Sequence, residues 1–173
     1  MDLPIVSPEE PCSAVVYSLV TRLGDAGKIK IQKLVYFLQE AYGLPLGCRF
    51  YMHHYGPYSE DVESTIAALK VMGYVNVRPD PEGYGFHVIP ASTGEPGWAT
   101  VIASVEEQIS NAWGKLGSMD AQELELAATI HYVKKSLGFR KGDVVSSVRG
   151  RKPKFSKKLI AEAYDNLSSM GLL

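Results

Sequence analysis

The sequence has few cysteines, lacks long apolar runs and carries no common catalytic signature. Its two cysteines, Cys12 and Cys48, do not form a Cys-x-x-Cys pair, so we expect reduced thiols packed in the core. No stretch approaches the roughly 18 consecutive apolar residues of a membrane span. Residues 1–10 are acidic and lack the basic start and apolar stretch of a signal peptide. We therefore expect a cytoplasmic protein with no membrane partner.

The motifs of the common enzyme classes are also missing. The chain contains no P-loop, no Gly-x-Ser-x-Gly and no His-Glu-x-x-His. His53 and His54 are adjacent, and neighbouring side chains of a strand point to opposite faces, which disfavours a shared metal ion. His131 lies near an apolar helical stripe and is expected in the core. We therefore expect no catalytic residues, no cofactor, no metal site and no enzymatic activity.

Hydrophobic periodicity predicts a mainly α (α+β) fold. Helices are expected over 11–25, over 28–42 and from an N-cap at Ser59 to about residue 72. In the second of these, Lys33 is expected on the face opposite the buried stripe. A strand is expected over 49–55, ended by Gly56-Pro57, and a β-hairpin over 74–78 and 84–89. This order of elements is that of a winged-helix-like lobe with a short strand and a β-hairpin.

An all-helical C-terminal lobe is expected to follow a Pro- and Gly-rich linker at residues 90–97. Helices are predicted over 100–116, over 120–137 behind an Asp120-x-x-Glu123 capping box, over 143–148 capped by Asp143, and from Ser156 onward. We assign residues 1–92 to the winged-helix-like lobe and 98–173 to the helical lobe. Packing of both into one domain is left open.

Basic residues are concentrated near the C-terminus. Residues 133–158 contain ten Lys or Arg and one acid, so this tract carries +9 while the rest of the chain carries −10. The alternatives are a binding surface for an anion or a partner's carboxylates, and a solvated face. The segment 149–154 is interpreted as a proline-containing loop. The candidate anion- or partner-binding residues are Arg149, Arg151, Lys152, Lys154, Lys157 and Lys158.

A second candidate surface is rich in aromatic residues. Tyrosine is favoured at interfaces because it offers a large contact area at low entropic cost. A strand packed between helices is the alternative for this segment. The candidate interface residues are Tyr51, His53, Tyr55 and Tyr58.

The predicted third helix argues against ordinary DNA reading by a winged helix. That helix normally enters the major groove, but here its first turn carries Glu60, Asp61 and Glu63. Carboxylates facing phosphates would be repelled. Any DNA binding is therefore expected from the basic tract.

Several motifs resemble known prokaryotic families. Lys33-Leu-Val-Tyr-Phe-Leu-Gln39, Gly43-x-Pro45-Leu46 and Tyr55-Gly-Pro-x-Ser59 resemble the uncharacterised YwgA-like proteins and the related phage-associated Panacea or SocA-like antitoxin domain. Leu124-x-x-Ala-Ala-Thr-Ile130 and Lys152-Pro-Lys-Phe-Ser156 extend the resemblance. It implies an antitoxin- or adaptor-like role without catalytic residues. The tryptophan that often precedes Tyr-Gly-Pro in the SocA-like pattern is replaced here by His53-His54.

Three functional hypotheses follow. The first is a non-enzymatic regulatory binding protein that acts through protein–protein contacts, with a protein partner. The second is a DNA-binding transcriptional regulator that uses the basic tract 134–158. The third is an enzyme whose motifs are not recognisable in the sequence. The first is preferred at this stage because the third helix is acidic and catalytic motifs are missing.

Overall fold

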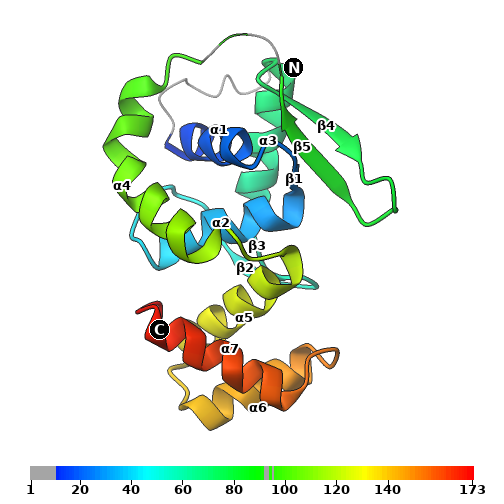
Figure 1. Cartoon of the computed structure of the whole chain (residues 1–173), viewed down its shortest axis with the longest axis vertical. Helices are drawn as coiled ribbons and strands as arrows, with labels where there is room; N and C mark the ends of the chain where they lie inside the picture. Colours follow the sequence, from blue (N-terminus) through cyan, green and yellow to red (C-terminus); the bar gives the residue numbers. More distant parts are fainter. Residues whose placement is uncertain (1–10, 92–93, 95) are drawn as a thin grey trace.

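The computed structural model describes residues 11–91, 94 and 96–173, and this part of the chain is mainly helical with some β structure (Figure 1). The helices are α1 (Pro11–Leu23), α2 (Lys28–Glu40), α3 (Glu60–Val71), α4 (Ala99–Leu116), α5 (Ala121–Leu137), α6 (Lys141–Arg151) and α7 (Lys157–Ser169). The strands are β1 (Ala26–Gly27), β2 (Tyr51–His53), β3 (Gly56–Tyr58), β4 (Val75–Pro79) and β5 (Phe86–Pro90). The expected α+β class is confirmed. Among the described helices, none has both the length and the apolar character needed to cross a bilayer.

The N-terminal half has the element arrangement of a winged helix. Helices α1, α2 and α3 pack beside an antiparallel sheet with the strand order β1-β5-β4. The β4–β5 hairpin, which we call the wing, projects to one side of the helices (Figure 1). Strand β1 was not expected from the sequence because it has only two residues, Ala26 and Gly27, which pair with β5.

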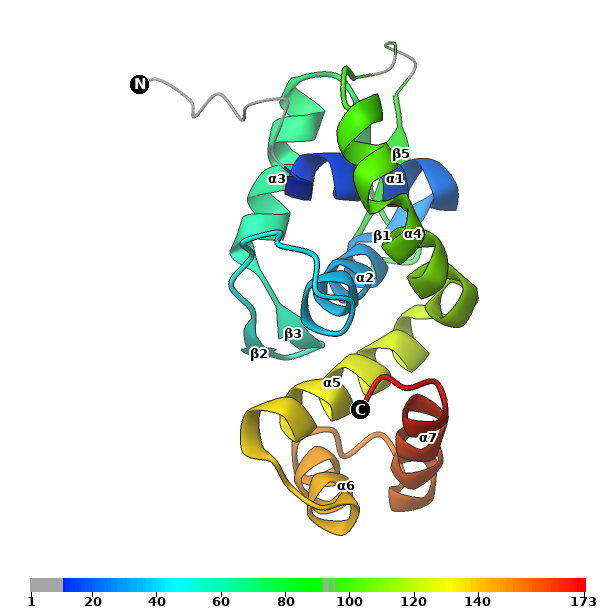
Figure 2. The same ribbon diagram turned by 90° about the vertical axis from the view of Figure 1, so that its left-hand side faces the viewer.

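Helix α5 lies between the two halves of the molecule. It packs against α2 and β3 on one side and against α6 and α7 on the other (Figure 2). A single cluster of buried apolar side chains runs through both halves and includes Leu34, Ile109, Ile130 and Ile160. The division into ranges 1–92 and 98–173 stays a prediction. Residues 1–10 and part of the expected linker (92, 93 and 95) lie outside the described residues.

Local capping signals located several helix starts correctly. The Ser59 hydroxyl accepts a hydrogen bond from the Asp61 N–H at the start of α3. Asp120 and Glu123 form the expected capping box of α5. The expected cap at Asp143 is wrong, because α6 begins at Lys141. Asp143 lies instead in the first turn, where its negative charge is favoured by the helix dipole.

Several predicted boundaries are shifted by one or two residues, and two segments differ in the kind of structure they form. The strand expected over 49–55 is in fact a two-strand hairpin, and Gly56-Pro57 begins its second strand instead of ending the first. Proline is accommodated there because the sheet has only two strands, so a missing N–H does not interrupt a further pairing. The loop expected from residue 149 is helical to Arg151. Basic side chains are favourable in the last turn of a helix, which explains this extension of α6.

A histidine between two carboxylates ties the turn end of the wing to the segment between α1 and β1. His87 Nδ1 lies 2.6 Å from Asp25 Oδ1, and its Nε2 lies 2.6 Å from Asp80 Oδ2. Arg78 adds an ion pair to Asp25. Hydrogen bonds to Asp25 and then Asp80 raise the pKa of His87. The pKa values of both carboxyls are lowered, that of Asp25 chiefly by its bond to His87.

This arrangement predicts a pH-dependent wing. The pKa of His87 is higher in the folded state than its unfolded-state value of about 6.5, so protonation of His87 stabilises the fold. This stabilisation is complete below the unfolded-state pKa and is lost as the pH rises through the folded-state pKa. Thermal unfolding of the wild type and His87→Gln should therefore differ most near pH 5.5 and converge toward pH 9. His54→Gln, a change at an exposed histidine, should show no such convergence. A constant difference between wild type and His87→Gln across this range would contradict the assignment.

Candidate nucleic-acid interface

The β2–β3 hairpin has two chemically different faces. Tyr51 pairs with Tyr58, and Met52 pairs with Pro57. Because side chains alternate along a strand, Tyr51, His53 and Tyr58 share one face, with neighbouring ring centroids 5.3–6.1 Å apart. Pro57 on the other face is buried, and Met52 packs against the core. The hairpin thus presents an aromatic face outward.

Helix α2 fixes the backbone beneath this aromatic face. The Gln32 side chain accepts a hydrogen bond from the Ser59 N–H at 3.0 Å and donates one to the Ser59 carbonyl at 2.9 Å. Lys33 Nζ donates to the Pro57 carbonyl at 2.6 Å. These contacts link the Lys-Leu-Val-Tyr-Phe and Tyr-Gly-Pro-x-Ser motifs, which are distant in the sequence.

The expectation that Lys33 lies on the exposed face of its helix is wrong. Its exposed fraction is 1%, because α2 is surrounded by α1, α4, α5 and β3. Burial lowers the pKa of the Lys33 ammonium to about 7; the nearby Glu125 opposes this effect and Lys152 adds to it. The unbroken apolar run from Leu34 to Leu38 is the signal that could have indicated a helix buried on all sides.

A buried carboxylate connects α5 with the segment between α6 and α7. Glu125 has an exposed fraction of 2%, and its Oε1 lies 2.8 Å from Lys152 Nζ. Its Oε2 lies 2.7 Å from Lys154 Nζ. Lys152 also donates a hydrogen bond to the His54 carbonyl in the turn of the hairpin. Sequence analysis missed Glu125, because a lone glutamate in an amphipathic pattern normally marks a solvent-facing position.

Most of the predicted basic residues have partners within the chain. Lys152 is buried with its ammonium paired to Glu125, so the structure places it away from the exposed surface. Arg149 donates to the carbonyls of Pro153 and Phe155, and Arg151 donates to Ser147. Arg151, Lys154, Lys157 and Lys158 are exposed, and the last two lie in the first turn of α7.

Lys154 joins the two candidate surfaces that the sequence presented separately. Its ammonium lies 5.9 Å from the centroid of the Tyr55 ring and 4.9 Å from that of Phe155. The Tyr55 side chain has an exposed fraction of 53%. We call Tyr51, His53, Tyr55, Tyr58 and Lys154 the hairpin site. Exposed aromatic faces beside a positive charge can stack on nucleobases and attract phosphate.

Helix α5, against which β3 packs, also makes a buried polar contact with α2. Its His131 Nδ1 is hydrogen-bonded to the Tyr36 hydroxyl at 2.7 Å, and burial lowers the pKa of His131 to about 4. The ring is therefore neutral at physiological pH. This confirms the expectation that His131 is a satisfied core residue.

A separate recess of about 250 Å³ lies between α5 and α7. Three carboxylates line it: Asp120, Glu123 and Glu162. The first two are engaged in the capping box of α5. Glu162 is exposed, and its Oε1 lies 3.9 Å from Lys158 Nζ. Among the described residues, no group of three or more His, Cys, Asp or Glu could hold a metal ion.

Comparison with known proteins points to an enzyme. No protein-family model matches the chain. A curated DNA ADP-ribosyl glycohydrolase from Thermus aquaticus is 29% identical over an alignment of 186 positions, which covers 98% of this chain and 49% of the relative. The chain thus spans about half the length of that relative.

This similarity corrects the preferred functional hypothesis. The expectation of a non-enzymatic, antitoxin- or adaptor-like regulator is contradicted, because the relative is named for an enzymatic activity on DNA. The expectation that the chain is not an enzyme, which relied on missing motifs, is contradicted by the same similarity. Motif searches find only sites whose residues are close together in the sequence. The hairpin site, by contrast, combines residues about 100 positions apart.

Gly56 is predicted to be intolerant of any side chain. It has φ +84°, and a Cβ there would lie 2.8 Å from Thr129 Oγ1 and 3.3 Å from the Glu125 carbonyl oxygen. Gly56→Ala should therefore lower the free energy of unfolding by about 2–5 kcal/mol, measured by urea denaturation. Gly83→Ala is the matched control, since Gly83 has φ +82° but open space around it. Equal losses in the two variants would show that the contact with α5 is unimportant.

Removal of the Glu125 charge should destabilise the protein strongly. Glu125→Gln leaves buried Lys152 without its counter-charge, which typically costs about 3–5 kcal/mol. Adding Lys152→Met should recover part of that loss, because the unpaired ammonium is then gone. The control Glu107→Gln, on the exposed side of α4, should change stability by less than about 0.5 kcal/mol. A double variant no more stable than Glu125→Gln would contradict the pairing.

Proposed function

We propose that this chain takes part in the enzymatic removal of ADP-ribose from DNA and that the hairpin site holds the nucleic acid. The similarity to the Thermus aquaticus DNA ADP-ribosyl glycohydrolase over 98% of the chain carries this proposal. The resemblance to YwgA-like proteins is compatible with it, since that family has no assigned activity.

The chemistry of the hairpin site supports the proposed substrate. ADP-ribosylated DNA offers nucleobases, including the adenine of the ADP-ribose group, together with phosphates. Tyr55 and the Tyr51–His53–Tyr58 face offer aromatic surfaces for stacking. The Lys154 side chain is 46% exposed, and because Lys152 and Lys154 share the single negative charge of Glu125, the cluster keeps a net positive charge for phosphate. The carboxylates that begin α3 are already engaged: Asp61 by Arg49, Glu63 by Lys28, and Glu60 by the Tyr51 hydroxyl.

Binding to DNA should depend on Tyr55. The probe is a fluorescently labelled oligonucleotide carrying one ADP-ribose group, titrated by anisotropy at low and physiological salt. Loss of one stacked base costs about 1–3 kcal/mol, so Tyr55→Ala should weaken binding by roughly 5- to 150-fold. Tyr84→Ala is the matched control, because Tyr84 is exposed in the turn of the wing, which belongs to a different sheet from the β2–β3 hairpin. Equal affinity of the Tyr55 variant and the wild type would contradict this site.

The contribution of Lys154 is tested in the same titration. Lys154→Ala should weaken binding and reduce the salt slope by about one, as expected for one phosphate contact. Lys70→Ala, at an exposed lysine on α3, should leave both quantities unchanged. An unchanged slope for Lys154→Ala would exclude this lysine as a phosphate contact.

Measuring the release of ADP-ribose from the same oligonucleotide distinguishes two roles of the chain, hydrolysis and substrate binding. Release of ADP-ribose by the chain alone would assign the hydrolysis to this chain. Glycosidic hydrolysis commonly uses carboxylates, so Glu162→Gln would then test whether the recess is the site of hydrolysis. Binding without release would assign it the substrate-holding part. If the chain neither bound the oligonucleotide nor released ADP-ribose from it, the proposed function would be contradicted.

A further inference from the structure

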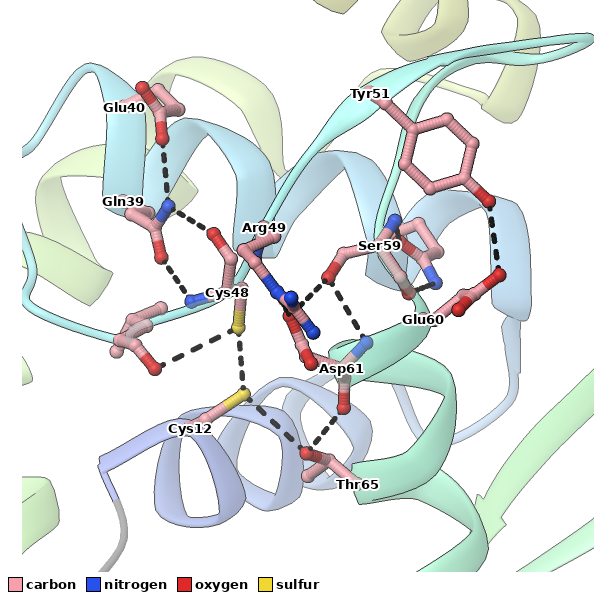
Figure 3. A network of polar contacts seen from close by, with 12 residues as sticks. Cys12, Gln39, Glu40, Cys48, Arg49, Tyr51, Ser59, Glu60, Asp61 and Thr65 are labelled. Atoms are coloured by element: carbon pink, nitrogen blue, oxygen red, sulfur yellow. Dashed lines mark hydrogen bonds and ion pairs between the residues drawn. The ribbon is translucent and has the colours of Figure 1, made fainter.

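Two thiols from distant parts of the sequence lie against each other beneath the hairpin. Cys12 is in the first turn of α1, and Cys48 is in the irregular segment between α2 and β2 (Figure 3). Their sulfurs are 3.3 Å apart although the residues are separated by 36 positions. Both side chains are buried, with exposed fractions of 7% and 6%.

The surrounding contacts hold Cys48 in this position. The Gln39 side chain donates to the Cys48 carbonyl at 2.7 Å and accepts from the Cys48 N–H at 2.8 Å. On the other side of the pair, Thr65 Oγ1 lies 3.7 Å from Cys12 Sγ. Figure 3 shows the two sulfurs pointing toward each other from α1 and from this segment. Gln39 thus fixes the Cys48 backbone while the two sulfurs are in contact.

We propose that Cys12 and Cys48 form a reversible intramolecular disulfide when the protein meets a small two-electron oxidant such as a peroxide. An S–S bond is about 2.05 Å long, so the sulfurs must approach by about 1.2 Å from their present separation. The inference does not depend on the proposed function.

The chemistry is balanced with hydrogen peroxide as oxidant. One sulfur, as its thiolate, attacks a peroxide oxygen; the O–O bond breaks, a sulfenic acid forms, and the departing hydroxide takes up a proton as water. The second sulfur then attacks the sulfenic sulfur, the S–O bond breaks, and the second water leaves with the remaining thiol proton. Two thiols are oxidised by two electrons in total, and one peroxide is reduced to two waters.

The buried position makes the pair slow to react. The hydrogen bond with Cys12 and burial both raise the pKa of Cys48, and the thiolate is the reactive form. Oxidation should therefore take longer than at an exposed cysteine and should accelerate as the pH rises. Thiols this deep would exclude bulky oxidants, so a small peroxide is the relevant class.

A disulfide here would tie α1 to the segment that leads into β2. It would close a loop that contains all of α2, and closing a loop reduces the entropy of the unfolded chain. Since β2 begins at Tyr51, three residues after Cys48, the oxidised form would also restrict movement of the hairpin relative to α1. The oxidised protein should unfold at a higher temperature than the reduced protein.

The test is treatment of the purified protein with hydrogen peroxide at pH 8.5, followed by denaturation, alkylation and intact-mass measurement. We expect a monomer about 2 Da lighter with no alkylated thiol, a Cys12–Cys48 linked peptide, and full reversal by dithiothreitol. Melting temperature should rise on oxidation and return on reduction. Methionine oxidation adds oxygen mass and is distinguishable from the loss of two hydrogens.

Cys12→Ala and Cys48→Ala serve as controls and should show neither the mass loss nor the shift in melting temperature. Two alkylatable thiols in the wild type after prolonged treatment would overturn the proposal. So would a disulfide found only between two chains on a non-reducing gel. These readouts use no DNA, so their failure is distinguishable from failure of the proposed function.

Discussion

The carboxylate of Glu125, enclosed between two lysines, is the contact on which the relation between the hairpin and the C-terminal helices depends. A charge shielded from water is tolerated only when opposite charges and hydrogen bonds are close. Lys152 meets this requirement and at the same time binds the backbone of the hairpin turn. A single buried ion cluster therefore brings α5, the α6–α7 segment and the hairpin into one fixed arrangement.

That arrangement also explains why an aromatic surface and a basic surface become one site. Lys154 reaches Tyr55 because its neighbour Lys152 is fixed inside the molecule, which directs this short segment toward the hairpin. The remaining positive charge of the tract is largely used in intramolecular contacts, so the net charge of +9 overstates what a ligand would meet. The proposed role in removing ADP-ribose from DNA relies on this local site together with similarity over nearly the whole chain.

Sequence reasoning succeeded where structure is set by neighbouring residues. The caps at Ser59 and Asp120 and the helical stripes were located correctly because they depend on short-range chemistry. It failed where long-range packing overrides local preference, as at Lys33, which is polar yet lies inside the core. Strand β1 was missed because its two residues are ordered only by pairing with β5. The hairpin site could be predicted as two groups of residues, but not as one surface.

The β2–β3 hairpin should tolerate substitutions of its side chains more easily than insertions into its strands. Its strands are joined by only two residues, His54 and Tyr55, and the second strand begins at a glycine pressed against α5. Inserting a single residue in a strand would shift the register and move the side chains beyond the insertion to the opposite face, which could expose Met52 or bury His53. Diversification of this surface among related proteins should therefore proceed by substitution of its aromatic residues, with insertions confined to the turn.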